Sequence, residues 1–223
     1  MITFVTAFIN FSKAKRSRDH YKQYFDRVVD TGINIVLFLD ADIEWTFPSN
    51  VYVQKVTMAD TWVGKNVSDD SIIPLSSNPA DTIEYMKIMN TKPEWLKRAA
   101  ELNVYNTDLF AWIDFGLAHV LSNVYPLSNL QEPLNTMATA GIWQSQSSDV
   151  WTNICWRFAG GFIILRKDRI DDFFEKTCDI IQRNQPNFSW EVNIWALLET
   201  EGFDFGWYPA NHDDSILNYP VSS

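Results

Sequence analysis

The apolar positions of this chain fall into short continuous runs that alternate with longer amphipathic stretches. Runs of this length are typical of strands that are buried on both faces, as in parallel sheets. Each run is bounded by polar or turn-forming residues, and the run at 158–165 opens on two adjacent glycines. The predicted strands lie at residues 3–8, 33–39, 51–56, 109–113, 158–165 and 203–208.

The stretches between these runs carry apolar residues at helical spacing, which predicts helices with one buried face. The first is expected between Ser17, a typical N-cap, and Gly32, a typical left-handed stop. Further helices are predicted at residues 81–103, with a break near Pro93, and at residues 168–182 and 189–201. The alternation of strands and helices predicts a single α/β domain, Rossmann-like, with a mostly parallel central sheet flanked by helices.

Residues 60–81 are predicted to be a surface loop because they are rich in Ser, Asp, Asn and Pro. Residues from about 122 to 152, with Pro126, Pro133, Gly141 and many Ser, Asn and Gln, are predicted to be a long loop with short helical pieces. Long loops in compact domains are usually functional or disordered. The tryptophans in and after the second loop favour an ordered segment that binds a ligand; these are Trp143, Trp151 and Trp156.

Asp114 stands directly after the apolar run 109–113 and is followed by Phe115 and Gly116. Ligands of α/β sheets collect just beyond the carboxyl ends of the strands, so Asp114 is predicted to stand at the mouth of a binding crevice. Gly116 would let the backbone turn sharply there. The residues leave a second interpretation open, in which Asp114 only caps a helical segment at 117–122.

Composition and charge narrow the range of ligands. The 223 residues carry a formal net charge of −10, which repels nucleic acid and anionic lipid. Any bound phosphate therefore needs a local source of positive charge, such as a metal ion. A basic loop after the first strand could also meet a pyrophosphate, although such loops are commonly solvated surface; its cations are Lys13, Lys15, Arg16 and Arg18.

Cys155 and Cys178 have no metal-like spacing and are interpreted as reduced thiols of an intracellular protein. The first residues do not have the pattern of a signal peptide, and no stretch approaches the roughly 18 apolar residues of a membrane span. We therefore expect a soluble, cytoplasmic protein with no membrane span and no nucleic-acid partner.

Four sequence pieces occur in an order that resembles the HtrL/YibB-like family. They are Thr6-Ala7-Phe8, Trp112-Ile113-Asp114-Phe115-Gly116, Ala159-Gly160-Gly161-Phe162 and Glu191 before a hydrophobic helix. Members of that family are regarded as glycosyltransferases of the GT-A type. The resemblance implies a GT-A-like fold, a nucleotide-sugar donor such as a UDP-sugar, a glycan or other hydroxyl acceptor, and a divalent metal, Mn²⁺ with Mg²⁺ as the alternative.

The resemblance also implies roles for individual residues. Asp114 would bind the metal, which would neutralise charge on the leaving diphosphate. Gly116 occupies the place of the usual second carboxylate, so His212 from the tail would supply a further ligand. The nucleotide would lie in the part formed by residues 1–116, and its expected contacts are Thr6, Ala7, Phe8, Arg16, Lys92, Asp114 and Gly116. Lys92 is expected on the polar face of its helix.

The part formed by residues 117–223 would bind the acceptor, with Gly160, Gly161 and Trp190 on that side. Glu191 would be catalytic together with Asp114, either as a general base or as a hydrogen-bond acceptor for a sugar hydroxyl. The alternative for Glu191 is a carboxylate favoured only by the dipole of its helix.

Asp40-Ala41-Asp42 is a rival metal site that fits the DxD pattern more literally. Only one strand and one helix precede it, which leaves too little chain to build the nucleotide pocket first, so it is placed second. It could instead lie near the ribose or base, or cap a turn.

Two other functions remain open from the sequence. A catalytically inactive relative could serve as a carbohydrate-binding or scaffold module, which the incomplete DxD pattern and the many tryptophans would allow. A nucleotidyltransferase of similar architecture is the other, although the first strand is not followed by a glycine-rich, basic phosphate loop.

Overall fold

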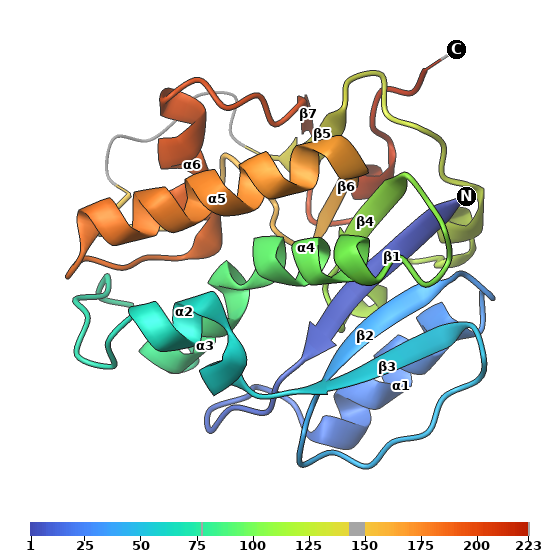
Figure 1. Cartoon of the computed structure of the whole chain (residues 1–223), viewed down its shortest axis with the longest axis horizontal. Coiled ribbons are helices and arrows are strands. Elements are labelled where there is room, and N and C mark those ends of the chain that lie inside the picture. The colour runs from blue at the N-terminus through green and yellow to red at the C-terminus, as the bar shows by residue number, and fades with distance from the viewer. Residues whose placement is uncertain (77, 143–149, 223) are drawn as a thin grey trace.

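The computed structural model describes residues 1–76, 78–142 and 150–222. Seven strands form one continuous sheet in the order β3-β2-β1-β4-β6-β5-β7 (Figure 1). The strands are β1 (Ile2–Phe8), β2 (Ile35–Asp40), β3 (Val51–Val56), β4 (Leu109–Ile113), β5 (Met137–Gly141), β6 (Phe162–Arg166) and β7 (Trp207–Pro209). Only β6 runs antiparallel to its neighbours. The prediction of a single α/β domain with a mostly parallel central sheet is confirmed.

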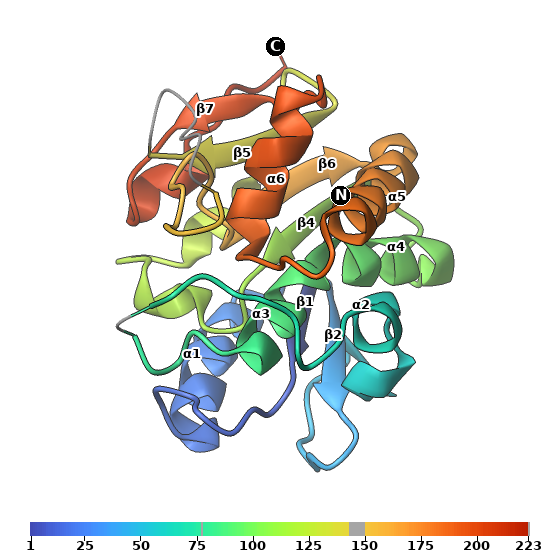
Figure 2. The same cartoon turned by 90° about the vertical axis from the view of Figure 1, so that its left-hand side faces the viewer.

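Helices cover both faces of this sheet. They are α1 (Arg18–Val29), α2 (Trp62–Asn66), α3 (Ile83–Asn90), α4 (Lys92–Leu102), α5 (Lys167–Asn184) and α6 (Glu191–Thr200). Helices α4 and α5 lie side by side on the face opposite α1 (Figures 1 and 2). The buried apolar side chains accordingly form two clusters. One contains Trp95, Phe173 and Trp195 from α4, α5 and α6, and the other contains Phe25 from α1.

Several helix boundaries follow local signals in the sequence. The side chain of Ser17 accepts a hydrogen bond from the backbone N–H of His20 and caps α1, as predicted. Gly32 has a φ of +75°, which confirms the left-handed stop. Thr91 separates α3 from α4, and Pro93 lies in the first turn of α4, where its missing N–H costs no helical hydrogen bond. The predicted break near Pro93 is therefore confirmed.

The predicted loop at 122–152 is wrong in part because it contains β5. Its sequence, Met137–Gly141, consists largely of small residues with little intrinsic preference for strands. The strand forms because it pairs with β6 on one side and β7 on the other, both distant in the sequence. The predicted loop at 60–81 likewise contains the short helix α2.

Two predicted strands are too long. The strand expected at 158–165 begins only at Phe162, after both glycines, and the strand expected at 203–208 is reduced to Trp207–Pro209. The glycines therefore belong to the segment that leads into β6. Their role is described with the site below.

Trp143 lies outside the described residues. Trp151 is half-buried and Trp156 is partly exposed, and their predicted part in binding stays a prediction. Cys155 and Cys178 are not joined in a disulfide, and burial raises the pKa of the Cys178 thiol to about 12. Within residues 1–76, 78–142 and 150–222, no helix combines the length and apolarity needed to cross a membrane.

Candidate active site

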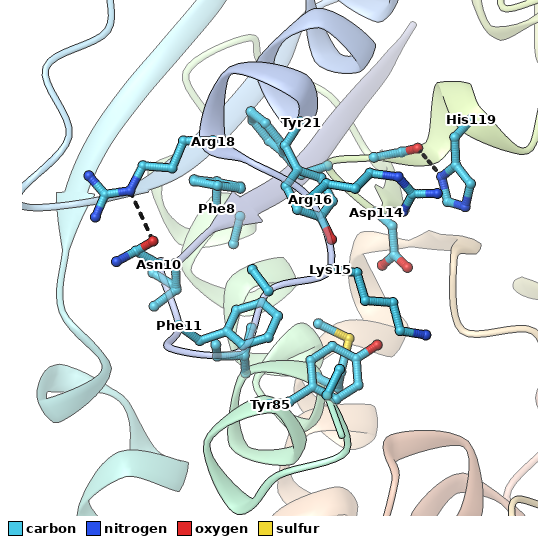
Figure 3. Close-up of a pocket in the computed structure, with 18 of the residues that line it drawn as sticks. Phe8, Asn10, Phe11, Lys15, Arg16, Arg18, Tyr21, Tyr85, Asp114 and His119 are labelled. Atoms are coloured by element: carbon cyan, nitrogen blue, oxygen red, sulfur yellow. Dashed lines mark hydrogen bonds between the residues drawn. The ribbon is translucent and has the colours of Figure 1, made fainter. Parts of the chain in front are cut away.

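A cavity of about 350 Å³ lies at the carboxyl ends of β1 and β4, where the sequence predicts a binding crevice (Figure 3). Its wall is built from the loop after β1, the start of α1, helix α3 with the residues before it, the turn after β4, and one residue of the tail. The carboxyl ends of neighbouring parallel strands meet at one edge of a sheet, which brings these distant segments together.

Aromatic rings form much of the cavity wall. Phe8 at the end of β1 contacts the rings of Tyr21 and Phe115, with centroids 5.7 and 4.7 Å away. Phe11 and Tyr85 form a second aromatic pair, 5.5 Å apart. Flat, amphipathic surfaces of this kind bind bases and sugar rings well. Burial, followed by the negative charges of Glu191 and Asp114, raises the pKa of Tyr85, so its hydroxyl stays protonated and can donate a hydrogen bond.

Three cations of the loop after β1 also line the cavity, namely Lys15, Arg16 and Arg18 (Figure 3). Hydrogen bonds hold the loop in place: Arg18 Nε donates to Asn10 Oδ1 over 2.9 Å, and the backbone N–H of Asn10 donates to Asp40 Oδ2 over 3.0 Å. These cations concentrate positive charge at one cavity in a chain with a net charge of −10. Arg16 was predicted as a cofactor contact, whereas Lys15 and Arg18 were recognised only as members of a basic loop.

Asp114 lies at the cavity wall with its side chain 38% exposed. Its Oδ1 accepts a hydrogen bond from Trp112 Nε1 over 2.8 Å and lies 3.0 Å from Lys92 Nζ. Both contacts use Oδ1, which leaves Oδ2 for the cavity. The following helical turn, Leu117–His119, has no side-chain cap, so the capping alternative for Asp114 is wrong.

Lys92 lies behind Asp114, and its expected place on a polar helix face is wrong. The side chain is 1% exposed, and Nζ lies 2.8 Å from both Glu191 Oε1 and the Gly160 carbonyl oxygen. Burial alone would lower the pKa of Lys92, but the charges of Asp114 and Glu191 outweigh burial and raise it. Lys92 is therefore an ammonium ion between two carboxylates. Any influence on a bound nucleotide passes through these partners.

The other residues predicted to contact the nucleotide divide into two groups. Ala7, Phe8 and Gly116 line the cavity. Thr6 is fully buried in β1, and its hydroxyl has no hydrogen-bond partner among the described residues. It belongs to the interior behind the cavity.

The two glycines predicted on the acceptor side are packed against Asp114 and its charged neighbours, Lys92 and Glu191. A Cβ atom on Gly160 would lie 2.4 Å from Glu191 Oε1, whereas a Cβ on Gly161 would lie 3.5 Å from Asp114 Oδ2. Gly160 thus allows Lys92 and Glu191 to approach the backbone closely. Trp190 is 5% exposed and precedes α6. Contact of these residues with an acceptor stays a prediction.

In the rival Asp40-Ala41-Asp42 motif, the carboxylate of Asp40 stabilises a turn. The carboxylate of Asp40 accepts hydrogen bonds from the backbone N–H groups of Asn10 and Asp42, and Asp42 itself is exposed. The sequence left three roles open for this motif: a metal site, a place near the ribose or base, or capping of a turn. These two hydrogen bonds are those of a turn cap.

His212 of the tail reaches the same cavity as Asp114, and His119, which the sequence analysis did not identify, lies beside it. The two imidazole rings are 6.2 Å apart. Within the described part of the chain, no group of three or more His, Cys, Asp and Glu side chains is placed to hold a metal ion. Asp114 and His212 line the same cavity, and their service as metal ligands stays a prediction, in which phosphate and water would have to supply the remaining ligands.

The tail is an anchored part of the fold, because β7 pairs with β5 and Asp214 accepts a hydrogen bond from the Ser122 backbone N–H over 2.8 Å. Ile216 and Tyr219 are buried in the core. A protein truncated before Asn211 would lose these side chains as well, so truncation cannot isolate the contribution of His212.

His212→Ala is therefore the informative variant of the tail. We expect it to melt like the wild type and to weaken Mn²⁺-dependent UDP binding about tenfold, because one imidazole ligand is lost while Asp114, phosphate and water still bind the metal. Titration calorimetry with UDP, with and without Mn²⁺, measures this difference. Equal affinity in both proteins would remove His212 from the site.

The fold and the cavity define a single-domain α/β protein with a ligand site at the carboxyl edge of its parallel strands. The chain belongs to the HtrL_YibB family, which is described as a bacterial protein of unknown function and matches residues 72–187. That range contains the Asp114 motif and the two glycines before β6, whereas Thr6 and Glu191 lie outside it. No curated protein matches the chain in sequence.

Several solved structures are similar to this fold at low sequence identity. A glycosyltransferase involved in the glycosylation of the major capsid of PBCV-1 has a TM-score of 0.47 and 12% identity, over 94% of this chain and 81% of that one. The 4-diphosphocytidyl-2C-methyl-D-erythritol synthase of Anaerococcus prevotii DSM 20548 has a TM-score of 0.49 and 8% identity, over 96% and 90%. The bifunctional IspDF of Campylobacter jejuni has a TM-score of 0.46 and 10% identity, over 96% and 50%. Structural similarity at such low sequence identity does not show that this chain has the activity of any of these proteins.

Proposed function

We propose that the protein is a metal-dependent glycosyltransferase that transfers a sugar from a nucleotide-sugar donor, such as a UDP-sugar, to a hydroxyl group of a glycan or another acceptor. The observation that carries the proposal is the placement of opposite charges around one aromatic-lined cavity. The carboxylate of Asp114 stands on one side, and the cations Lys15, Arg16 and Arg18 stand on another. A diphosphate with a bound divalent cation matches both sides.

Different residues of the cavity would bind different parts of the nucleotide-sugar donor. The rings of Phe8 and Tyr21 would stack on the base or ribose, and Lys15 and Arg16 would bind phosphate oxygens. Asp114 and His212 would hold Mn²⁺ or Mg²⁺. The bound metal would neutralise the charge that develops on the leaving diphosphate. In this proposal residues 1–116 supply most of the donor site, and the acceptor approaches from the part formed by residues 117–223.

Thermal melting with a panel of nucleotide sugars tests the proposal. A ligand that binds only the native state raises the melting temperature, so we expect a UDP-sugar to do so in the presence of Mn²⁺ and less in its absence. Release of UDP on addition of an acceptor would then identify transfer. Binding without any release would favour the inactive carbohydrate-binding or scaffold module, and no stabilisation by any donor would contradict the proposal.

The basic loop supplies a separate prediction. Lys15→Ala and Arg16→Ala should each weaken binding of UDP by about tenfold with or without metal, because each removes a charge-assisted hydrogen bond to phosphate. Lys13→Ala is the matched control, since Lys13 is an exposed cation of the same loop that is not part of the cavity wall. Calorimetry at fixed ionic strength compares the variants, and an equal loss in Lys13→Ala would mean that only long-range charge matters.

A nucleotidyltransferase is the second candidate, and the same loop favours it. The loop is not rich in glycine, but its cations line the cavity directly after β1, where they could bind a triphosphate. Such an enzyme would join a nucleotide to a phosphate acceptor and release pyrophosphate. Stabilisation by nucleoside triphosphates in preference to nucleotide sugars, followed by pyrophosphate release, would identify it.

A further inference from the structure

The ammonium group of Lys92 is enclosed by protein acceptors. Its surroundings supply Glu191 Oε1 and the Gly160 carbonyl oxygen, each 2.8 Å away, and Asp114 Oδ1, 3.0 Å away. A lysine ammonium has three N–H donors, and three protein acceptor atoms lie within 3.0 Å of this one, two in hydrogen bonds and Asp114 Oδ1 in an ion pair. Lys92 therefore has no donor left for a ligand.

Backbone contacts fix the three charged residues relative to one another. Lys92 and Glu191 are the first residues of α4 and α6. Just before these helices, Asn90 Nδ2 donates to the Ser189 carbonyl oxygen over 2.9 Å. On the other side, the backbone N–H of Asp114 donates to the Gly161 carbonyl oxygen, also over 2.9 Å. Contacts within the chain therefore set this arrangement.

The cluster of Lys92, Asp114 and Glu191 has one net negative charge, because it contains one ammonium ion and two carboxylates. The side chain of Glu191 is 9% exposed, whereas that of Asp114 is 38% exposed. The excess negative charge consequently reaches the cavity through Asp114. Since Oδ1 is occupied by Lys92 and Trp112, Oδ2 is the atom that can meet a cation.

We propose that Lys92 is the positioning residue of a divalent-cation site and that Glu191 is its buried countercharge. Lys92 fixes Asp114 through Oδ1 and so presents Oδ2 to the cation. Glu191 balances the charge of Lys92, so that Asp114 attracts the cation with its full negative charge. This inference rests on the proposed function, because it takes the cavity to be a metal site, and it assigns Glu191 a role through Lys92 in place of contact with the acceptor.

The roles of charge and position are separable by two variants. Glu191→Gln keeps the size of the side chain and a hydrogen-bond acceptor for Lys92 but removes one negative charge. Lys92→Met/Glu191→Gln removes one charge of each sign, so its net charge equals that of the wild type, while Asp114 loses the ammonium ion that holds it. The double variant also avoids leaving Glu191 buried without a partner.

The experiment is a titration of each protein with Mn²⁺ in the presence of UDP, with free Mn²⁺ followed by electron paramagnetic resonance. We expect Glu191→Gln to bind Mn²⁺ about tenfold more weakly, since a negative charge near the cation is lost in a partly buried site. The double variant should bind about fivefold more weakly although its charge is restored, because Asp114 is no longer oriented. UDP binding without metal should not weaken in either variant.

Lys97→Met is the matched control, because it removes a cation from the same helix whose partners are Asp171 and Glu101, away from the cavity. It should bind Mn²⁺ as the wild type does. Wild-type affinity in Glu191→Gln would overturn the countercharge role and leave Glu191 open as a general base, and wild-type affinity in the double variant would overturn the positioning role. If the wild type itself binds no Mn²⁺, the metal-dependent function fails and this inference fails with it.

Discussion

Asp114→Asn is expected to lower the affinity for UDP in the presence of Mn²⁺ by about a hundredfold, because it removes the charged ligand of the metal, and we place this loss at the upper end of the tenfold to hundredfold range known for residues around metal sites. The amide oxygen of Asn can still accept hydrogen bonds from Trp112 and Lys92, so the fold around the site should persist. Titration calorimetry with and without Mn²⁺ measures the effect. In the metal-free titration the variant should bind at least as well as the wild type, since a negative charge near the phosphates has been removed.

Asp42→Asn is the control for this experiment. It makes the same chemical change in the rival DxD motif, where Asp42 is exposed and Asp40 accepts backbone hydrogen bonds in a turn. We expect Mn²⁺-dependent affinity close to that of the wild type. A loss as large as that in Asp114→Asn would move the metal site to Asp42, and undiminished, Mn²⁺-dependent binding by Asp114→Asn would remove Asp114 from it.

The elements that were predicted well are those whose structure is encoded locally. The strand β3 has the bounds that were predicted, residues 51–56, and α1 begins after Ser17 because that hydroxyl caps the helix. The position of Asp114 was also predictable, because a buried strand must end at an edge of the sheet and a carboxylate followed by a turn is suited to that edge.

The features that were missed depend on contacts between distant segments. The residues of β5 become a strand only when they pair with β6 and β7. Lys92 was expected on or near the polar face of its helix, and the sequence alone does not indicate that Glu191, 99 residues away, is its partner. The signal that was available, a lysine beside Pro93 at the start of a helix, is unfavourable for the helix dipole and suggests a carboxylate nearby.

The residues of the cavity were predicted from the sequence only in part. The cluster of cations after β1 was visible in an acidic sequence, but only the folded chain places Lys15 and Arg18 at the same cavity as Asp114. Tyr85 and His119 had no distinguishing pattern, since an aromatic residue or a histidine at helical spacing is usually interpreted as core or surface. Their place at the cavity follows from the packing of α3 and of the turn after β4 against the end of β1.

Gly160→Ala is expected to destabilise the protein by about 2 kcal/mol and to lower its melting temperature by roughly 4–8 °C. A Cβ atom at this position would lie 2.4 Å from Glu191 Oε1 and 3.1 Å from Lys92 Nζ. The end of a glutamate side chain usually moves aside at little cost. Here the movement weakens its ion pair with the buried ammonium group of Lys92, which is why the substitution is expected to be costly.

Gly161→Ala is the matched control for Gly160→Ala, because its new Cβ would be in ordinary van der Waals contact, 3.5 Å from Asp114 Oδ2. It should melt close to the wild type. A double-mutant cycle then tests whether the clash with Glu191 causes the destabilisation. In a Glu191→Ala background this clash is absent, so Gly160→Ala should destabilise the protein much less there than in the wild type. Thermal melting of the four proteins in the cycle measures the coupling. An equal cost in both backgrounds would mean that Gly160 is required for its backbone conformation, and that the close packing of Lys92 and Glu191 against it does not determine the effect.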